Sequence, residues 1–211
     1  MWTRVELKNQ CKQVMSRSYG KMLLISLFTS AVLGFVSFDI TEIINNANII
    51  ALLSLCFILL DIFCCNPIVC GSCRFYTLNS AQNAKFSEIF YAFRSDQYWN
   101  VVKIMFFQKL KIFLWTLLFL VPGIIKAYEY SMIPYLLAEN PGMDMNEAFS
   151  RTKEMTQGQK LNMFILDLSF AGWYIAGMIT LGLILIMAAP YIYGVQAELY
   201  LKLKANSSVI Y

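Results

Sequence analysis

The chain of 211 residues contains no histidine. Histidine is the usual general base near neutral pH and a common metal ligand. Its absence excludes Ser-His and Cys-His nucleophile pairs, the HExxH zinc site and proton relays built on imidazole. No phosphate-binding loop or other familiar catalytic motif is present either. These absences predict a protein that is not an enzyme and that carries no cofactor.

Charged residues are also scarce, at 14% of the chain, whereas hydrophobic residues make up 58%. Both values differ strongly from those of soluble domains. The 5 prolines and 10 glycines are too few and too local to mark a linker. The net charge of +4 comes without a basic block or a zinc-finger pattern, which argues against nucleic acid as a partner. A single integral membrane domain covering residues 1–211 is therefore predicted.

Long apolar runs predict six transmembrane helices, because about 20 apolar residues cross the hydrocarbon core of a bilayer. The expected spans are 22–38, 49–69, 103–122, 124–138, 161–180 and 183–203. The third is expected to end at a helix break, Pro122-Gly123, since proline removes a backbone donor and glycine permits a turn. Pro134 interrupts the fourth span. Whether 122–138 crosses fully or continues the preceding span with a kink is left open.

Two amphipathic helices are expected on the cytoplasmic surface of the membrane. Within residues 3–20, Arg4, Lys8 and Lys12 recur every four residues. A separate apolar face is formed by Leu7, Cys11, Val14 and Met15. The second helix is indicated by apolar residues at helical spacing, namely Phe86, Ile89, Phe90 and Phe93. Such helices typically lie in the membrane interface.

A further helix is predicted in the polar segment 139–160. Asp144 is suited to cap its N-terminus, and Gly158 is a natural stop. Glu147 and Arg151 are four residues apart and can pair on its exposed side. Its other side is formed by Met145, Ala148, Phe149, Thr152 and Met155.

The distribution of basic residues predicts the orientation of the chain. With six crossings, sixteen of the 17 lysines and arginines fall on one side, and only Lys126 does not. The first loop on the opposite side, 39–48, contains no lysine or arginine. Both termini are thus expected to be cytoplasmic. An alternative with five crossings, in which 112–138 is one kinked span, would put Arg151, Lys153 and Lys160 outside.

Two aspartates inside apolar spans, Asp61 and Asp167, are the first candidates for a polar site. A carboxylate inside the membrane is costly and normally faces the bundle interior with a partner. Each aspartate could anchor two helices by pairing with Lys109, Lys111 or Lys160. The alternatives left open are a proton or cation site and an intramembrane aspartyl dyad.

Lys126 and Glu129 are the second candidates, because residues three apart can pair on one helix face. They could simply neutralise each other beside the Pro122-Gly123 break. Alternatively, the broken helix could line a cavity in which both residues contact a polar substrate.

Four cysteines, Cys64, Cys65, Cys70 and Cys73, invite a metal assignment, and the last two form a CxxC motif. A second CxxC motif is missing, and two of the cysteines lie inside a predicted span. The expectation is therefore reduced, buried thiols and no metal site.

Combined motifs across nearly the whole chain resemble a known family. They are Leu114-Trp115, Pro122-Gly123-Ile124-Ile125-Lys126-Ala127-Tyr128, Tyr130-Ser131-Met132, Pro134-Tyr135, Leu137-Ala138-Glu139-Asn140-Pro141, Glu147-Ala148, Gly158-Gln159-Lys160, Phe164, Leu166-Asp167-Leu168-Ser169-Phe170, Gly172-Trp173, Pro190-Tyr191 and Ala197-Glu198-Leu199-Tyr200. Together they resemble a bacterial family of integral membrane proteins, the domain of unknown function nine-seven-five. The resemblance implies a multi-pass protein of the bacterial plasma membrane and brings no established activity. Where relatives carry a second glycine after Gly182, this chain has Ile184, which puts a tight turn there in doubt.

The expected fold is an all-α bundle of six transmembrane helices with amphipathic helices on the cytoplasmic side. The expected function is non-enzymatic, as a membrane scaffold or accessory protein or as a small transporter-like bundle. The alternative is an intramembrane enzyme or an ion pathway that uses Asp61 and Asp167. The lipid bilayer is the expected partner, and a homo-oligomer or another membrane partner remains open.

Overall fold

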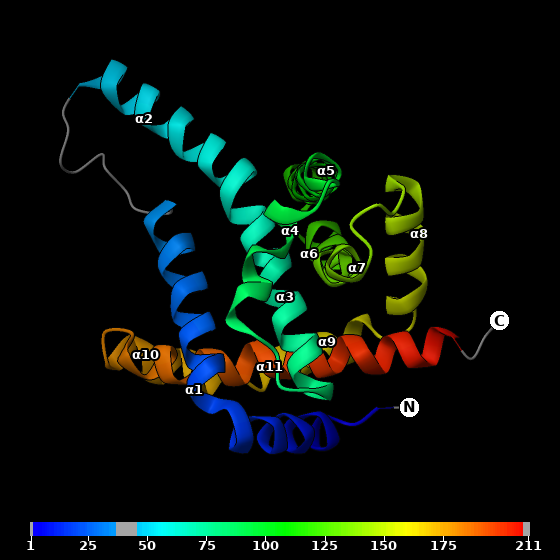
Figure 1. Ribbon diagram of the computed structural model, residues 1–211. Coiled ribbons are helices and arrows are strands. Elements are labelled where there is room, and N and C mark those ends of the chain that lie inside the picture. Colours follow the sequence, from blue (N-terminus) through cyan, green and yellow to red (C-terminus); the bar gives the residue numbers. More distant parts are fainter. Residues whose placement is uncertain (1, 37–45, 209–211) are drawn as a thin grey trace.

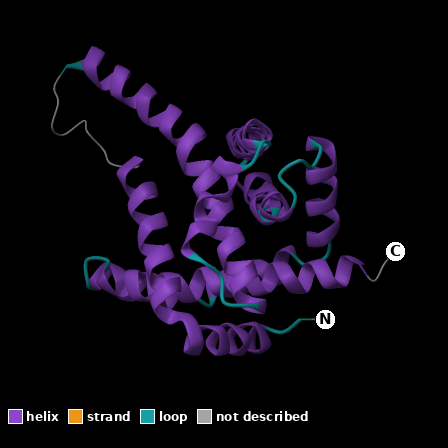
Figure 2. Ribbon diagram, in the orientation of Figure 1, coloured by secondary structure: helices purple, strands orange, loops and turns teal. Residues whose placement is uncertain are grey.

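The computed structural model describes residues 2–36 and 46–208. All regular secondary structure within these ranges is helical, as predicted (Figure 2). Most of the loop expected at 39–48, including Asp39, Glu42 and Asn45, lies outside the described residues. Where the chain resumes, the Asn46 side chain caps the next helix by accepting from the backbone amides of Asn48 and Ile49.

The helices follow one another in a simple order. They are α1 (Arg4–Val36), α2 (Ala47–Leu60), η1 (Asp61–Cys65), α3 (Asn66–Ala81), η2 (Phe86–Phe90), α4 (Tyr91–Arg94), α5 (Tyr98–Leu118), α6 (Leu120–Tyr130), α7 (Ile133–Glu139), α8 (Met145–Thr156), α9 (Lys160–Leu168), α10 (Ala171–Ile179) and α11 (Leu183–Ser208). Figure 1 shows α11 running across the molecule, with α5, α6 and α7 seen nearly end-on above it.

Within the described residues, four helical stretches are long and apolar enough to cross a membrane. They are Arg4–Phe35, Asn48–Ala81, Lys160–Ile179 and Leu183–Ser207. These stretches contain or overlap the first, second, fifth and sixth predicted spans. None of the four stretches found among the described residues covers the predicted spans 103–122 and 124–138. Helix α5 carries three lysines, and α6 has only 11 residues.

The break between α5 and α6 lies at Phe119, three residues earlier than predicted. Phe119 is extended, with φ −155° and ψ 138°. The predicted break motif, Pro122-Gly123, instead lies in the first turn of α6, where proline costs little because the first amides have no helical partner. The two helices pack as a hairpin, and a Cβ on Gly123 would lie 2.6 Å from the Cα of Thr116. Pro134 likewise lies in the first turn of α7.

Helix α1 bends at Ser18, whose φ of −144° and ψ of 22° are not helical. The half before the bend packs against α11, and the half after it rises beside α3 (Figure 1). The predicted apolar face of the first half is buried within the protein: Leu7 is 0% and Cys11 1% exposed. The thiol of Cys11 donates to the carbonyl of Tyr191 in α11. At Leu7 and Cys11 this face therefore packs on protein, and an interfacial position of this half of α1 stays a prediction.

The second predicted interfacial helix is two short helices, η2 and α4. Ile89 is fully buried, and the ring of Phe28 in α1 contacts the rings of Phe86 and Phe90. A Cβ on Gly71 of α3 would lie 1.9 Å from the carbonyl oxygen of Ile89. The segment is thus docked on α1 and α3, because glycine allows α3 to approach it closely.

Helix α8 has the ends that the sequence predicted. The Asp144 side chain accepts a hydrogen bond from the backbone amide of Asn146. Gly158, just beyond the end of the helix, has a φ of +71°. Glu147 and Arg151 pair at 2.9 Å. The predicted apolar side is buried at four residues, Ala148, Phe149, Thr152 and Met155, whereas Met145 is partly buried.

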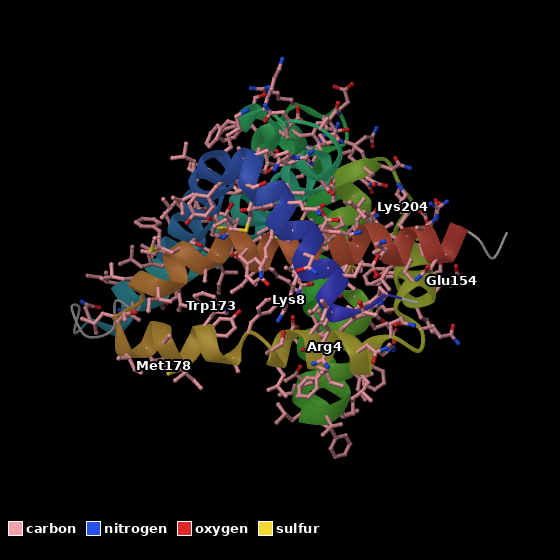
Figure 3. All side chains as sticks on the ribbon, turned by 90° about the horizontal axis from the view of Figure 1, so that it is seen from below. Arg4, Lys8, Glu154, Trp173, Met178 and Lys204 are labelled. Carbon is pink, nitrogen blue, oxygen red and sulfur yellow. The ribbon has the colours of Figure 1, made fainter. Side chains whose placement is uncertain are left out.

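Exposed apolar side chains gather at the ends of the helical hairpins. Leu181, in the turn between α10 and α11, is 96% exposed, and this turn remains tight because Gly182 adopts a φ of +88°. Figure 3 shows Trp173 and Met178 on the opposite side of the molecule from Glu154 and Lys204. The end of the α5–α6 hairpin is similarly exposed, at Phe113, Leu117, Leu118, Phe119, Leu120 and Val121. Apolar surface of this extent is typical of lipid contact.

Candidate functional site

Asp61 lies at the start of η1, a π-helical turn between α2 and α3. Its Oδ2 accepts a hydrogen bond of 2.6 Å from the Nζ of Lys109 in α5. This ion pair is one of those that the sequence allowed. It connects α5 to the turn that links α2 to α3.

Asp167 in α9 has neutral partners. Its Oδ2 accepts from the Tyr128 hydroxyl at 2.9 Å, and its Oδ1 accepts from the Gln196 amide at 2.7 Å. It belongs to none of the ion pairs between described residues, so the expected lysine partner is wrong for this aspartate. Asp61 and Asp167 share no partner, and the structure does not join them into a dyad.

Glu129 is the centre of a buried charge cluster, with only 4% of its side chain exposed. The predicted pair with Lys126 is present at 2.6 Å. Lys160 of α9 binds the other carboxylate oxygen, a contact that sequence spacing could not indicate. The hydroxyl of Thr152 in α8 donates to the Glu129 carbonyl at 2.9 Å. The cluster therefore ties α6 to α8 and α9.

A cavity of about 300 Å³ lies next to Asp167. It is lined by residues of α1, α3, α6, α7, α9 and α11, and neither Lys126 nor Glu129 lines it. Its polar lining consists of Thr29, Ser72, Cys73, Tyr76, Tyr128, Ser131, Tyr135, Asp167, Tyr193 and Gln196. Thr29 is 3% exposed, and its hydroxyl has no hydrogen-bond partner. The cavity thus combines a carboxylate, an unpartnered hydroxyl and four tyrosines.

A further buried carboxylate, Glu198 in α11, escaped the sequence analysis. It is 7% exposed and accepts a hydrogen bond of 2.6 Å from the Ser80 hydroxyl. Arg17, beside the bend of α1, donates to the Ser80 carbonyl at 2.6 Å. The sequence could have indicated this residue, because Glu198 is an acidic residue within the predicted span 183–203. Its surroundings form a polar junction between α1, α3 and α11.

All six cysteines are free thiols. The Cys70 thiol donates to the carbonyl of Pro134, and both Cys70 and Cys73 are buried. Within residues 2–36 and 46–208, no group of three or more cysteine, aspartate or glutamate side chains is arranged to hold a metal ion.

Comparison with known proteins agrees with the family resemblance and adds no chemistry. No curated protein and no solved structure matches the chain. Residues 120–207, which contain Glu129, Asp167 and Glu198, match the model of a family described as a protein of unknown function (DUF975), so the resemblance inferred from the sequence is confirmed over this part of the chain.

Proposed function

We propose that this chain is a non-enzymatic, multi-pass scaffold or accessory protein of the bacterial plasma membrane, with both termini in the cytoplasm. The observation that carries the proposal is the pairing of its embedded charges. Asp61 with Lys109, and Glu129 with Lys126 and Lys160, are used in contacts between helices. An aspartyl enzyme would need two adjacent carboxylates, whereas Asp61 and Asp167 have separate partners.

The α5–α6 hairpin bears on the number of crossings. The Nζ of Lys111 lies 3.5 Å from the ring centroid of Phe149 in α8, a helix with a charged outer side. Beyond Lys111, the apolar end of α5 is only about 10 Å long at 1.5 Å per residue. A hydrocarbon core is about 30 Å thick. This supports four crossings, with the hairpin entering from the cytoplasmic face, over the six predicted from the sequence.

A second candidate function is that of a small transporter-like bundle. The cavity beside Asp167 favours it, because a carboxylate without a cationic partner inside a bundle is typical of substrate and ion pathways.

The anchor role of Asp61 is tested by a double-mutant cycle with Lys109. Asp61→Asn and Lys109→Met should each lower the melting temperature of the purified protein in detergent only slightly, because the two side chains are 31% and 49% exposed and the pair is partly screened. The double variant should lose less than the sum of the two single losses. An Asp61→Asn variant that is more stable than the parent would contradict the proposal, since groups kept for chemistry are often held at the expense of stability.

A further inference from the structure

We propose that the cavity beside Asp167 binds a small primary ammonium group. The inference goes beyond the scaffold role, because that role requires no ligand. The Asp167 carboxylate has no cationic partner: within the described residues, it accepts hydrogen bonds only from the neutral side chains of Tyr128 and Gln196. A carboxylate in such a setting retains capacity to accept hydrogen bonds from a cation.

The rest of the lining offers acceptors. The Thr29 hydroxyl is buried without a partner, and Thr29 is a residue of α1 that lines the cavity. The hydroxyls of Ser72 and Ser131 donate to the carbonyls of Val69 and Tyr128, which leaves their lone pairs free to accept. A primary ammonium has three donors and no acceptor, so its hydrogen-bonding needs match this set.

The aromatic lining favours a cation over a neutral donor. Four tyrosines border the cavity, and the rings of Tyr76 and Tyr193 lie 5.9 Å apart. Elsewhere, lysine and arginine side chains lie over aromatic rings, as Lys111 does over Phe149. None of the cation–π contacts in the described part of the chain involves a tyrosine of the cavity. No lysine or arginine of the described residues therefore competes for these rings, although the Tyr135 ring is already stacked on Tyr200.

The volume of the cavity favours an occupant larger than a bare ion. Its volume of about 300 Å³ corresponds to several water molecules and lies at the lower end of small-molecule sites. An alkylammonium of a few carbon atoms would fill it. Two sources share this chemistry: a free amine and the ethanolamine head group of a phospholipid.

The full chain, reconstituted in phosphatidylcholine nanodiscs, tests the inference by calorimetric titration with free ethanolamine. A second set of discs contains phosphatidylethanolamine, and the readout there is the melting temperature. Binding of ethanolamine assigns the site to a free amine. Stabilisation by phosphatidylethanolamine alone assigns it to the lipid head group. Both results support an ammonium site, whereas an effect of neither probe overturns it.

Variants and a neutral probe then test the contacts. Asp167→Asn should weaken whichever probe acts by about tenfold or more, the factor expected when a charge-assisted hydrogen bond is lost. Thr29→Val should also weaken it and should preserve folding, because the Thr29 hydroxyl has no partner to lose. Glu147→Gln, on the exposed side of α8, is the matched control and should leave binding unchanged. Equal binding of ethylene glycol, or unchanged binding by the Thr29→Val variant, would refute the inference.

Discussion

At the scale of single residues, partner chemistry distinguishes the embedded acids. Among the described residues, the Glu129 carboxylate forms ion pairs with two lysines and the Asp61 carboxylate with one. The Asp167 carboxylate forms no ion pair. Losing one member of a buried pair is costly because the remaining charge is left without compensation in a poorly polarisable environment. Glu129 should therefore be the acid on which stability depends most.

The substitution Glu129→Gln tests this ranking. It would leave Lys126 and Lys160 without their carboxylate, although both lysine side chains retain about a quarter of their exposure. Since a fully buried pair costs 3–5 kcal/mol to break, we expect a loss of about 2 kcal/mol in the free energy of unfolding. Thermal or denaturant unfolding in detergent would measure it.

Glu147→Gln provides the comparison for Glu129→Gln. The Glu147 and Arg151 side chains are 43% and 56% exposed, so water already screens their pair. Its loss should cost only about 0.5 kcal/mol. Equal losses in the two variants would show that burial of the Glu129 cluster contributes nothing to stability.

At the scale of helices, close backbone approach shapes the hairpins. Without a hydrophobic effect between helices in lipid, small residues stabilise packing by letting backbones come together. Gly123 allows α6 to fold back on α5 directly after the single extended residue Phe119. Gly71 does the same for α3 and η2.

Gly123→Ala should open the α5–α6 hairpin. The added methyl group would lie 2.6 Å from the Cα of Thr116, so a backbone and not merely a side chain must move. Overpacking of this kind costs about 1–3 kcal/mol, which a lowered melting temperature would reveal. In α10, a Cβ on Gly172 meets no atom within 4 Å, so Gly172→Ala should leave the melting temperature unchanged or slightly raised. A harmless Gly123→Ala would show that the hairpin is not closely packed.

At the scale of the whole molecule, the basic residues and the exposed apolar surface bear on how the chain lies in a membrane. With the six crossings predicted from the sequence, sixteen of the 17 basic residues fall on the same side of the membrane. Exposed apolar residues lie along α2, from Ile49 to Leu60, and at the ends of the α5–α6 and α10–α11 hairpins. The positive-inside rule then favours a cytoplasmic location for the regions around residues 90 and 150 in both the four-crossing and the six-crossing arrangement.

Topology mapping distinguishes the arrangements. Reporter fusions after residues 90 and 150 should both report a cytoplasmic location, and an external signal after 150 would instead favour five crossings. If the α5–α6 hairpin enters the bilayer without crossing it, as proposed, a Phe119→Cys variant compared with the parent in intact cells should resist an impermeant maleimide. Labelling at this position would establish that the hairpin crosses fully.

The sequence alone determined the features that depend on local spacing and composition. The all-helical class, the Asp144 cap, the stop at Gly158 and the Lys126–Glu129 pair all followed from neighbours within a few positions. The resemblance to DUF975 was also recognisable from the sequence, because it rests on shared motifs and not on a physical argument about folding.

Only the tertiary structure decided which distant groups meet. Lys160 binds Glu129 across 31 positions of sequence, and Asp167 takes Gln196 instead of a lysine. From the sequence, the apolar face of the first half of α1 could contact either a bilayer or another part of the protein. In the structure its residues Leu7 and Cys11 are buried, and Cys11 contacts Tyr191 of α11. The physical reason is that helical periodicity fixes which residues share a face, whereas the order in which helices pack fixes what that face contacts.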